Sequence, residues 1–86
     1  MRIRLLGSEA ALSTSTGNTF NNATLVRLVN PTTGAVVVTL NENDDSTLVG
    51  TFTIAAGQTE FLQKEPDQKV LAASTSVLGV KVGYTH

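Results

Sequence analysis

The last nine residues of the chain read LGVKVGYTH (residues 78–86), and large apolar side chains alternate there with small or polar ones without a break. Alternation with a period of two is typical of a β-strand that buries one face and exposes the other. The same period recurs in LVGTFTI (residues 48–54), and turn-forming residues separate the stretches in between. The sequence therefore predicts a protein made almost entirely of strands and turns.

The turn signals recur at intervals of about 8 to 12 residues, which predicts about seven strands in a small antiparallel β-sandwich or barrel, immunoglobulin-like or jelly-roll-like. We expect residues 1–86 to form one such domain, because a chain of this length has no room for a second core. The sequence NPTTG (residues 30–34) is a turn signal, and the strands on either side of it are expected to pair as a hairpin. The predicted strands are residues 2–6, 24–30, 35–40, 47–54, 59–64, 69–73 and 78–86.

The period of two also predicts which side chains of these strands point into the core. Residues 24–30 are apolar on both faces, which places this strand in the middle of a sheet. In the strand LVGTFTI we expect Leu48, Phe52 and Ile54 to point inward. Gly50 lies on the same face and suggests either a bulge or the close approach of another backbone. In residues 59–64, either of the two central apolar residues, FL, takes the core position.

Residues 7–22 differ in kind from the rest, since they are small, polar and rich in Ser, Thr and Asn. Loops of about 16 residues are unusual in a small domain and tend to be functional or poorly ordered. Ser8 is placed to cap a single helical turn over residues 9–12. The loop also carries two apolar anchors, Leu12 and Phe20, for which two alternatives stay open. They either tuck back onto their own domain or lie against a partner.

Composition and charge exclude several classes of function. Charged residues make up 15% of the chain and the net charge is −1, so we expect no nucleic-acid binding. The chain has no cysteine, which excludes disulfides and thiolate metal ligands. No stretch approaches the roughly 18 to 20 apolar residues of a membrane span. Glu9 interrupts the short apolar start where an export signal needs its core, so we expect synthesis in the cytoplasm and no membrane association.

The search for reactive groups predicts no catalytic residue, no cofactor and no metal. Asn41, Asn43 and Asp45 resemble the start of a calcium loop. The match then fails, because Ser46 and Phe52 stand where that loop needs Gly and a bidentate Glu. Thirteen threonines and six serines supply hydroxyl groups, but no internal histidine is present to act as their base. We therefore expect that the protein is not an enzyme.

Surface recognition is the remaining class of function. In the first predicted strand, Arg2, Arg4 and Leu6 share one face, while Ile3 and Leu5 share the other. The face of Arg2, Arg4 and Leu6 would extend a sheet on a neighbouring protein. The residues predicted to bind a partner are these three together with Leu12 and Phe20 of the loop. A domain this small, without disulfides, is often stabilised by burying surface against copies of itself or against a partner, and we expect a homo-oligomer.

Four stretches together resemble a known class of protein: ATLVRLVN (23–30), GTFTIAAGQ (50–58), KEPDQKVLA (64–72) and VKVGY (80–84). They are similar to the small β-rich virion proteins of tailed bacteriophages, marine and cyanobacterial phages in particular, some of which decorate or cement the capsid. The resemblance implies a structural protein of the virion, made in the host cytoplasm, that binds the major capsid protein or another virion protein in many copies.

Two other functions stay open at the level of sequence. One is a carbohydrate-binding or host-surface-binding module, which would stack aromatic side chains on sugar rings. The chain offers three Phe and one Tyr for that purpose. The other is a neck or tail component of the same virion, which copy number per particle would distinguish from a decoration protein.

Overall fold

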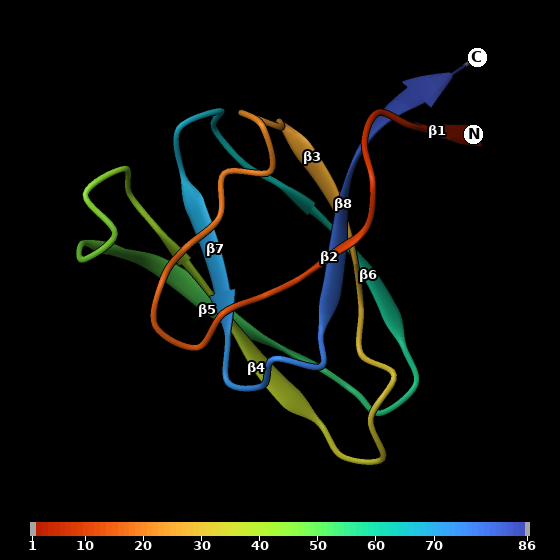
Figure 1. Ribbon diagram of the computed structural model, residues 1–86, viewed down its shortest axis with the longest axis vertical. Coiled ribbons are helices and arrows are strands. Elements are labelled where there is room, and N and C mark those ends of the chain that lie inside the picture. Colours follow the sequence, from red (N-terminus) through yellow and green to blue (C-terminus); the bar gives the residue numbers. More distant parts are fainter. Residues whose placement is uncertain (1, 86) are drawn as a thin grey trace.

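Every regular element in residues 2–85, the part of the chain that the computed structural model describes, is a β-strand (Figure 1). The strands form two antiparallel sheets, which confirms the predicted all-β fold of the sandwich type. One sheet has the order β1-β8-β3-β6 with β2 beside β8, and the other has the order β5-β4-β7. The strands are β1 (Arg2–Leu5), β2 (Ala10–Ala11), β3 (Leu25–Val29), β4 (Val36–Asn41), β5 (Leu48–Ile54), β6 (Thr59–Gln63), β7 (Lys69–Ala72) and β8 (Leu78–Thr85).

The C-terminal strand β8 lies inside the first sheet, which explains why its alternation is so regular. Its first half pairs with β3 on one side, and its second half pairs with β1. Because β3 already occupies one side of Leu78 and Gly79, β2 pairs with these residues on the other side, the side of β1. Leu5 pairs with Val82, and Ala10 pairs with Gly79. Four residues lie between Leu5 and Ala10 but only two between Gly79 and Val82, so the N-terminal segment has two residues more than β8 over this interval. The N-terminal segment is thus one edge strand with an interruption.

The helical turn predicted over residues 9–12 is wrong. Ala10 and Ala11 pair with β8, and the Leu12 N–H donates to the Val77 carbonyl at 2.9 Å. A single helical turn fixes several backbone dihedrals for one hydrogen bond and is unstable alone. Pairing with β8 instead satisfies backbone groups of this segment within a sheet. This segment accounts for the eighth strand, which the sequence did not predict.

In the second sheet the central strand is β4, with β5 on one side and β7 on the other. Val36, Val38 and Leu40 of this strand are buried, as their spacing predicts. The pairing of β4 with β5 shifts between Leu40 and Asn41, where β5 contains one residue more than β4. The predicted bulge is therefore confirmed beside Gly50. The other reading of Gly50 is wrong, because a Cβ there would meet nothing within 4 Å.

The predicted hairpin on either side of NPTTG is also wrong. β3 pairs with β6 and β8, whereas β4 pairs with β5 and β7, so this turn crosses from one sheet to the other. The fully buried Asn30 holds the crossing. Its Nδ2 donates to the Gly34 carbonyl at 2.8 Å and to the Ile54 carbonyl at 2.9 Å. The predicted central position of β3 in its sheet is confirmed.

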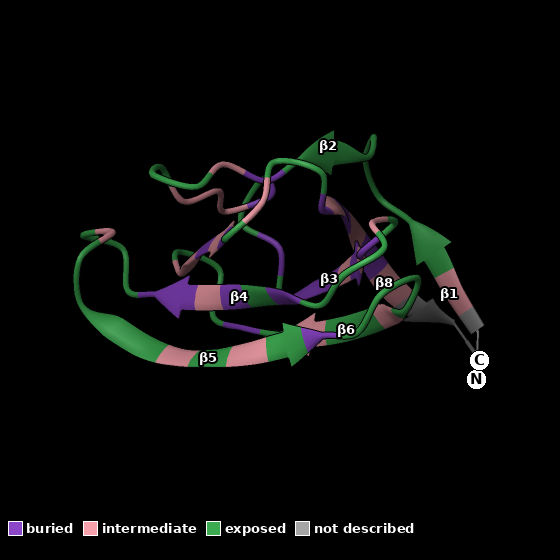
Figure 2. Cartoon of the chain, turned by 90° about the horizontal axis from the view of Figure 1, so that it is seen from below, coloured by how far each residue is buried: buried purple, intermediate pink, exposed green. Residues whose placement is uncertain are grey.

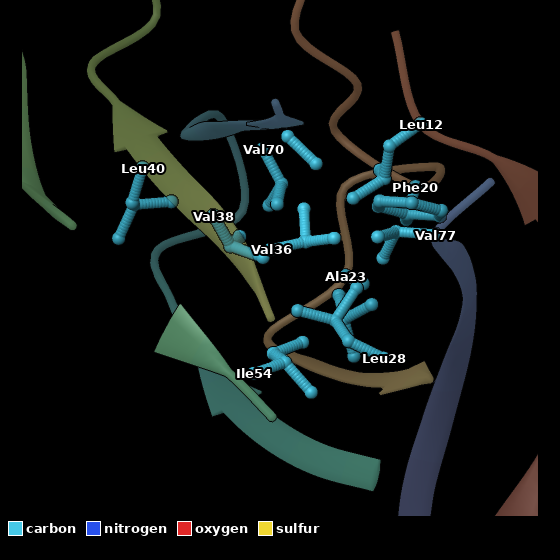
Figure 3. Close-up of a cluster of buried hydrophobic side chains, with 12 residues drawn as sticks. Leu12, Phe20, Ala23, Leu28, Val36, Val38, Leu40, Ile54, Val70 and Val77 are labelled. Atoms are coloured by element: carbon cyan, nitrogen blue, oxygen red, sulfur yellow. The ribbon is translucent and has the colours of Figure 1, made fainter. Parts of the chain in front are cut away.

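The main core lies between the two sheets and beneath the N-terminal loop (Figure 3). In β6 the core position belongs to the partly buried Leu62, while Phe61 is 49% exposed. The inward orientation predicted for Leu48 is wrong, because this residue is 60% exposed and lies before the bulge that interrupts the alternation of β5. The buried members of the core are Leu12, Phe20, Ala23, Val26, Leu28, Val36, Val38, Leu40, Ile54, Val70, Ala72 and Val77.

Candidate interaction surface

Leu5, the last residue of the outer strand β1, and Leu6, which follows it, are two neighbouring apolar residues exposed to solvent. Figure 2 shows β1 at the margin of the molecule, with exposed residues along part of its length. Leu5 is 67% exposed and Leu6 is 46% exposed. β1 pairs with the end of β8, beyond the residues that pair with β3, so few other strands are close enough to cover it. Adjacent exposed apolar side chains, unlike single scattered ones, are typical of a contact surface.

The predicted face of Arg2, Arg4 and Leu6 lies on this exposed strand. Arg4 pairs with Gly83 and is exposed. The Leu6 N–H continues the ladder by donating to the β8 backbone at 2.9 Å, and its side chain lies over Gly83, where a Cβ would be 3.2 Å from Leu6 Cδ1. The backbone of Arg2 pairs with Thr85, and its side chain lies outside the described residues. The described part of this face therefore combines a cation with an apolar side chain.

The opposite face of β1 borders a groove of about 400 Å³. The sequence did not place the exposed Leu5 among the partner-binding residues, because the period of two puts it with Ile3 on the face opposite Arg4 and Leu6. Arg27 Nη1 and Glu9 Oε2 lie 3.4 Å apart at this groove, and both side chains are partly exposed, so the pair contributes little to stability. The groove is lined by Ile3, Leu5, Gly7, Glu9, Arg27 and Val80.

A second hollow of about 200 Å³ lies on the Leu6 side of the strand. Two of its polar groups have partners: Lys81 Nζ donates to the Asn21 carbonyl at 3.1 Å, and Asn18 Oδ1 accepts from the Phe20 N–H at 2.7 Å. The lining residues are Leu6, Gly7, Ser8, Ala10, Asn18, Phe20, Asn21 and Lys81. Together the two hollows frame the strand from both faces.

The other two residues predicted to bind a partner, Leu12 and Phe20, do not lie on this surface. They are 1% and 6% exposed and belong to the main core of their own domain (Figure 3). Their predicted partner role is corrected, because the loop folds back: Ser13 accepts a backbone hydrogen bond from β7, and Asn18 pairs with Val70. Of the two alternatives for these anchors, the structure has the one in which they tuck inward.

Two carboxylates of the acidic loop after β4 accept hydrogen bonds from within the protein, and one of these bonds comes from the N-terminal loop. Asp45 Oδ2 accepts a hydrogen bond from the Gly17 N–H at 2.8 Å. Asp44 accepts from Thr47 Oγ1, Thr47 N–H and Ser46 N–H, which lowers its pKa to about 2. Within residues 2–85, three or more His, Cys, Asp or Glu side chains nowhere gather to form a metal site. The histidine at position 86 lies outside the described residues.

Comparison of the chain with protein-family models, with curated proteins and with solved structures found no match. In the described part of the chain, no helix has the length and apolarity needed to span a membrane.

Proposed function

We propose that this chain is a non-enzymatic structural protein of a bacteriophage virion, a decoration or cement subunit that binds the major capsid protein in many copies. The four stretches that resemble small phage virion proteins support the phage assignment. The immunoglobulin-like or jelly-roll-like topology belongs to the same proposal, since each is a form of the two-sheet fold that the strands adopt.

The observation that carries the proposal is the exposure of Leu5, at the end of the edge strand β1, and of Leu6, which follows it. An edge strand offers unpaired backbone groups to a neighbouring strand, and its outward side chains then supply specificity. Here Leu5 and Leu6 would bury apolar surface on both faces of the extended sheet, and Arg4 would contribute a charged contact.

When many copies bind one particle, a low affinity at each single contact is sufficient for stable binding. A strand addition of this size buries far less area than a standard stable interface. When the binding sites are arranged on a regular shell, several contacts act together and the observed affinity exceeds that of each one. A small module without its own catalytic chemistry is suited to that role.

The test is binding of the purified chain to shells of the phage that encodes it, after the native copies have been removed. We expect the unaltered chain to restore regular density across the shell. The double variant Leu5→Asp/Leu6→Asp is expected to weaken binding roughly tenfold or more, because two charges would enter an apolar contact. Val37→Asp, which alters an exposed apolar residue of the other sheet, serves as the control. Absence of the chain from purified particles would refute the proposal.

Carbohydrate binding is the second candidate, and the exposure of Phe61 favours it. Phe61 pairs with Arg27 across β3 and β6, so an exposed ring lies beside a side chain able to donate to sugar hydroxyls. A glycan-array signal that Phe61→Ala abolishes would select this function. A neck or tail position in the same virion is distinguished by copy number, which is far lower there than for a decoration protein.

A further inference from the structure

The edge of β5 differs from the other sheet edges in the described residues 2–85. Segment 13–18 runs beside β7 and bonds to its backbone. The outer strands β1 and β6 carry the exposed charged residues Arg4 and Glu60. β5 has the sequence LVGTFTI, with neither a charged residue nor a proline, and it pairs with β4 alone. Native proteins usually protect a long edge strand with charge, proline or a covering segment.

The register shows which backbone groups of β5 face the open edge. The Ala73 N–H donates to the Val37 carbonyl at 2.9 Å, so Val37 of β4 points its backbone groups toward β7. In an antiparallel pair, successive residues point their hydrogen-bonding groups to opposite sides. Val37 pairs with Thr53 in β5, and Thr51 lies two residues before it. The N–H and C=O groups of Thr51 and Thr53 therefore point away from β4, and both residues are exposed.

From this edge we infer that β5 binds the β5 strand of a second copy of the chain, antiparallel, across a two-fold axis at Phe52. Thr51 of each copy then exchanges backbone hydrogen bonds with Thr53 of the other, and the two three-stranded sheets join edge to edge. The five residues 50–54 pair with β4 without interruption, because the bulge lies before Gly50. Figure 2 shows β5 at the margin of the molecule, with exposed and intermediate residues along most of its length.

The distribution of charge favours antiparallel pairing of β5 with the same strand of a second copy. The loop before β5 contains Glu42, Asp44 and Asp45, whereas residues 55–58 after it, AAGQ, carry no charge. In an antiparallel pair, the acidic loop of one copy lies near the uncharged turn of the other. A parallel pair would bring two acidic loops together, and like charges in contact are destabilising. Because β5 itself is uncharged, no repulsion opposes its pairing with an identical strand.

This association goes beyond the proposed function, since it concerns the isolated chain and does not depend on a capsid. Amide hydrogen exchange on the unaltered protein tests it directly. At high concentration we expect a species of twice the 9.0 kDa monomer mass, with slowed exchange at the Thr51 and Thr53 amides that disappears on dilution. The Phe52 amide faces β4 and is expected to stay protected at every concentration.

A substitution that removes one backbone N–H group provides the second measurement. Thr53→Pro removes the N–H that faces the open edge and leaves the bonds to β4 intact, so the fold is expected to persist. We expect it to raise the dimer dissociation constant roughly tenfold or more in sedimentation equilibrium. Thr53→Val keeps the N–H and the strand preference, and is expected to leave the dimer unchanged.

Three results would overturn the inference. The first is a monomer up to millimolar concentration. The second is a dimer whose Thr51 and Thr53 amides exchange freely, which would place the interface elsewhere. The third is protection of these amides only when another protein is added, which would assign the edge to that protein in place of a second copy.

Discussion

The ring of Phe20 packs directly against Gly79, so closely that a Cβ at Gly79 would lie 2.6 Å from Phe20 Cζ. Gly79 belongs to β8 within the first sheet, while Phe20 comes from the long N-terminal loop. Because Gly79 has no side chain, β8 leaves a space there, and the Phe20 ring of the loop fills it. Phe20 itself has φ 52°, and the next two residues, both Asn, have φ 57°, a backbone conformation that Asn tolerates better than most residues.

Gly79→Ala is therefore expected to destabilise the protein. The new methyl group would also meet Leu28 Cδ2 at 2.9 Å, so both neighbours must move. Overpacking of this kind costs about 1 to 3 kcal/mol in the free energy of unfolding, which urea denaturation measures.

Gly34→Ala is the matched control for this substitution. A Cβ at Gly34 would meet nothing within 4 Å, and its φ is not positive. We expect it to leave stability unchanged or raise it by about 0.4 to 1 kcal/mol through the unfolded chain. Equal losses from both variants would mean that the contact with Phe20 does not limit packing.

The strands could be predicted from the sequence, but their partners could not. A period of two indicates that a segment has one buried face, but it does not indicate which strand lies beside that segment. NPTTG has the residues of a tight turn, yet here the turn passes between sheets because Asn30 bonds to Ile54 on a strand distant in sequence. That contact has no local signature.

Asn30→Ala is expected to destabilise the crossing between the sheets. It removes the donor to the Gly34 and Ile54 carbonyls and the acceptor for the Thr32 N–H and Oγ1, at 3.1 and 2.6 Å. Leaving one buried group unsatisfied costs about 1 to 3 kcal/mol, so we expect a loss of at least this size in thermal or urea unfolding. Asn43→Ala, at an exposed loop position, is expected to change stability by no more than about 0.5 kcal/mol. A similar loss from both variants would contradict this role of Asn30.

Part of the candidate site could also be predicted from the period of two. Arg4 and Leu6 follow from the alternation of the first strand, and both are exposed. Leu12 and Phe20 are apolar residues in a polar segment, a pattern that fits burial in the parent domain and burial against a partner equally well. For Phe20 the outcome depends on the space above Gly79, which only the assembled sheet reveals.

Acid is expected to weaken the turn between β4 and β5 through Asp44. Its carboxylate accepts three hydrogen bonds, from Thr47 Oγ1 at 2.7 Å, the Thr47 N–H at 2.9 Å and the Ser46 N–H at 3.0 Å. These bonds lower its pKa from 3.8 to about 2 in the folded protein. The resulting stabilisation is present above pH 3.8 and is lost as the pH falls toward about 2, because the unfolded chain binds the proton first. Asp44→Asn is expected to flatten this part of the stability profile in urea unfolding. An unchanged profile would contradict the assignment.

Alkali is expected to act in the opposite direction at Lys64, which is 5% exposed. Its Nζ donates to the Glu65 carbonyl at 3.1 Å and to the Pro66 carbonyl at 3.2 Å, but burial removes water from the ammonium group and lowers its pKa below 10.5. Between the folded pKa and 10.5 the unfolded chain binds more protons than the folded one, so this group makes the free energy of unfolding rise with pH in that window. Lys64→Met keeps an apolar stem of similar length and removes the titration. The difference between the two proteins in urea midpoints across this window measures the effect. A difference that stays constant with pH would mean that the buried ammonium group carries no desolvation penalty.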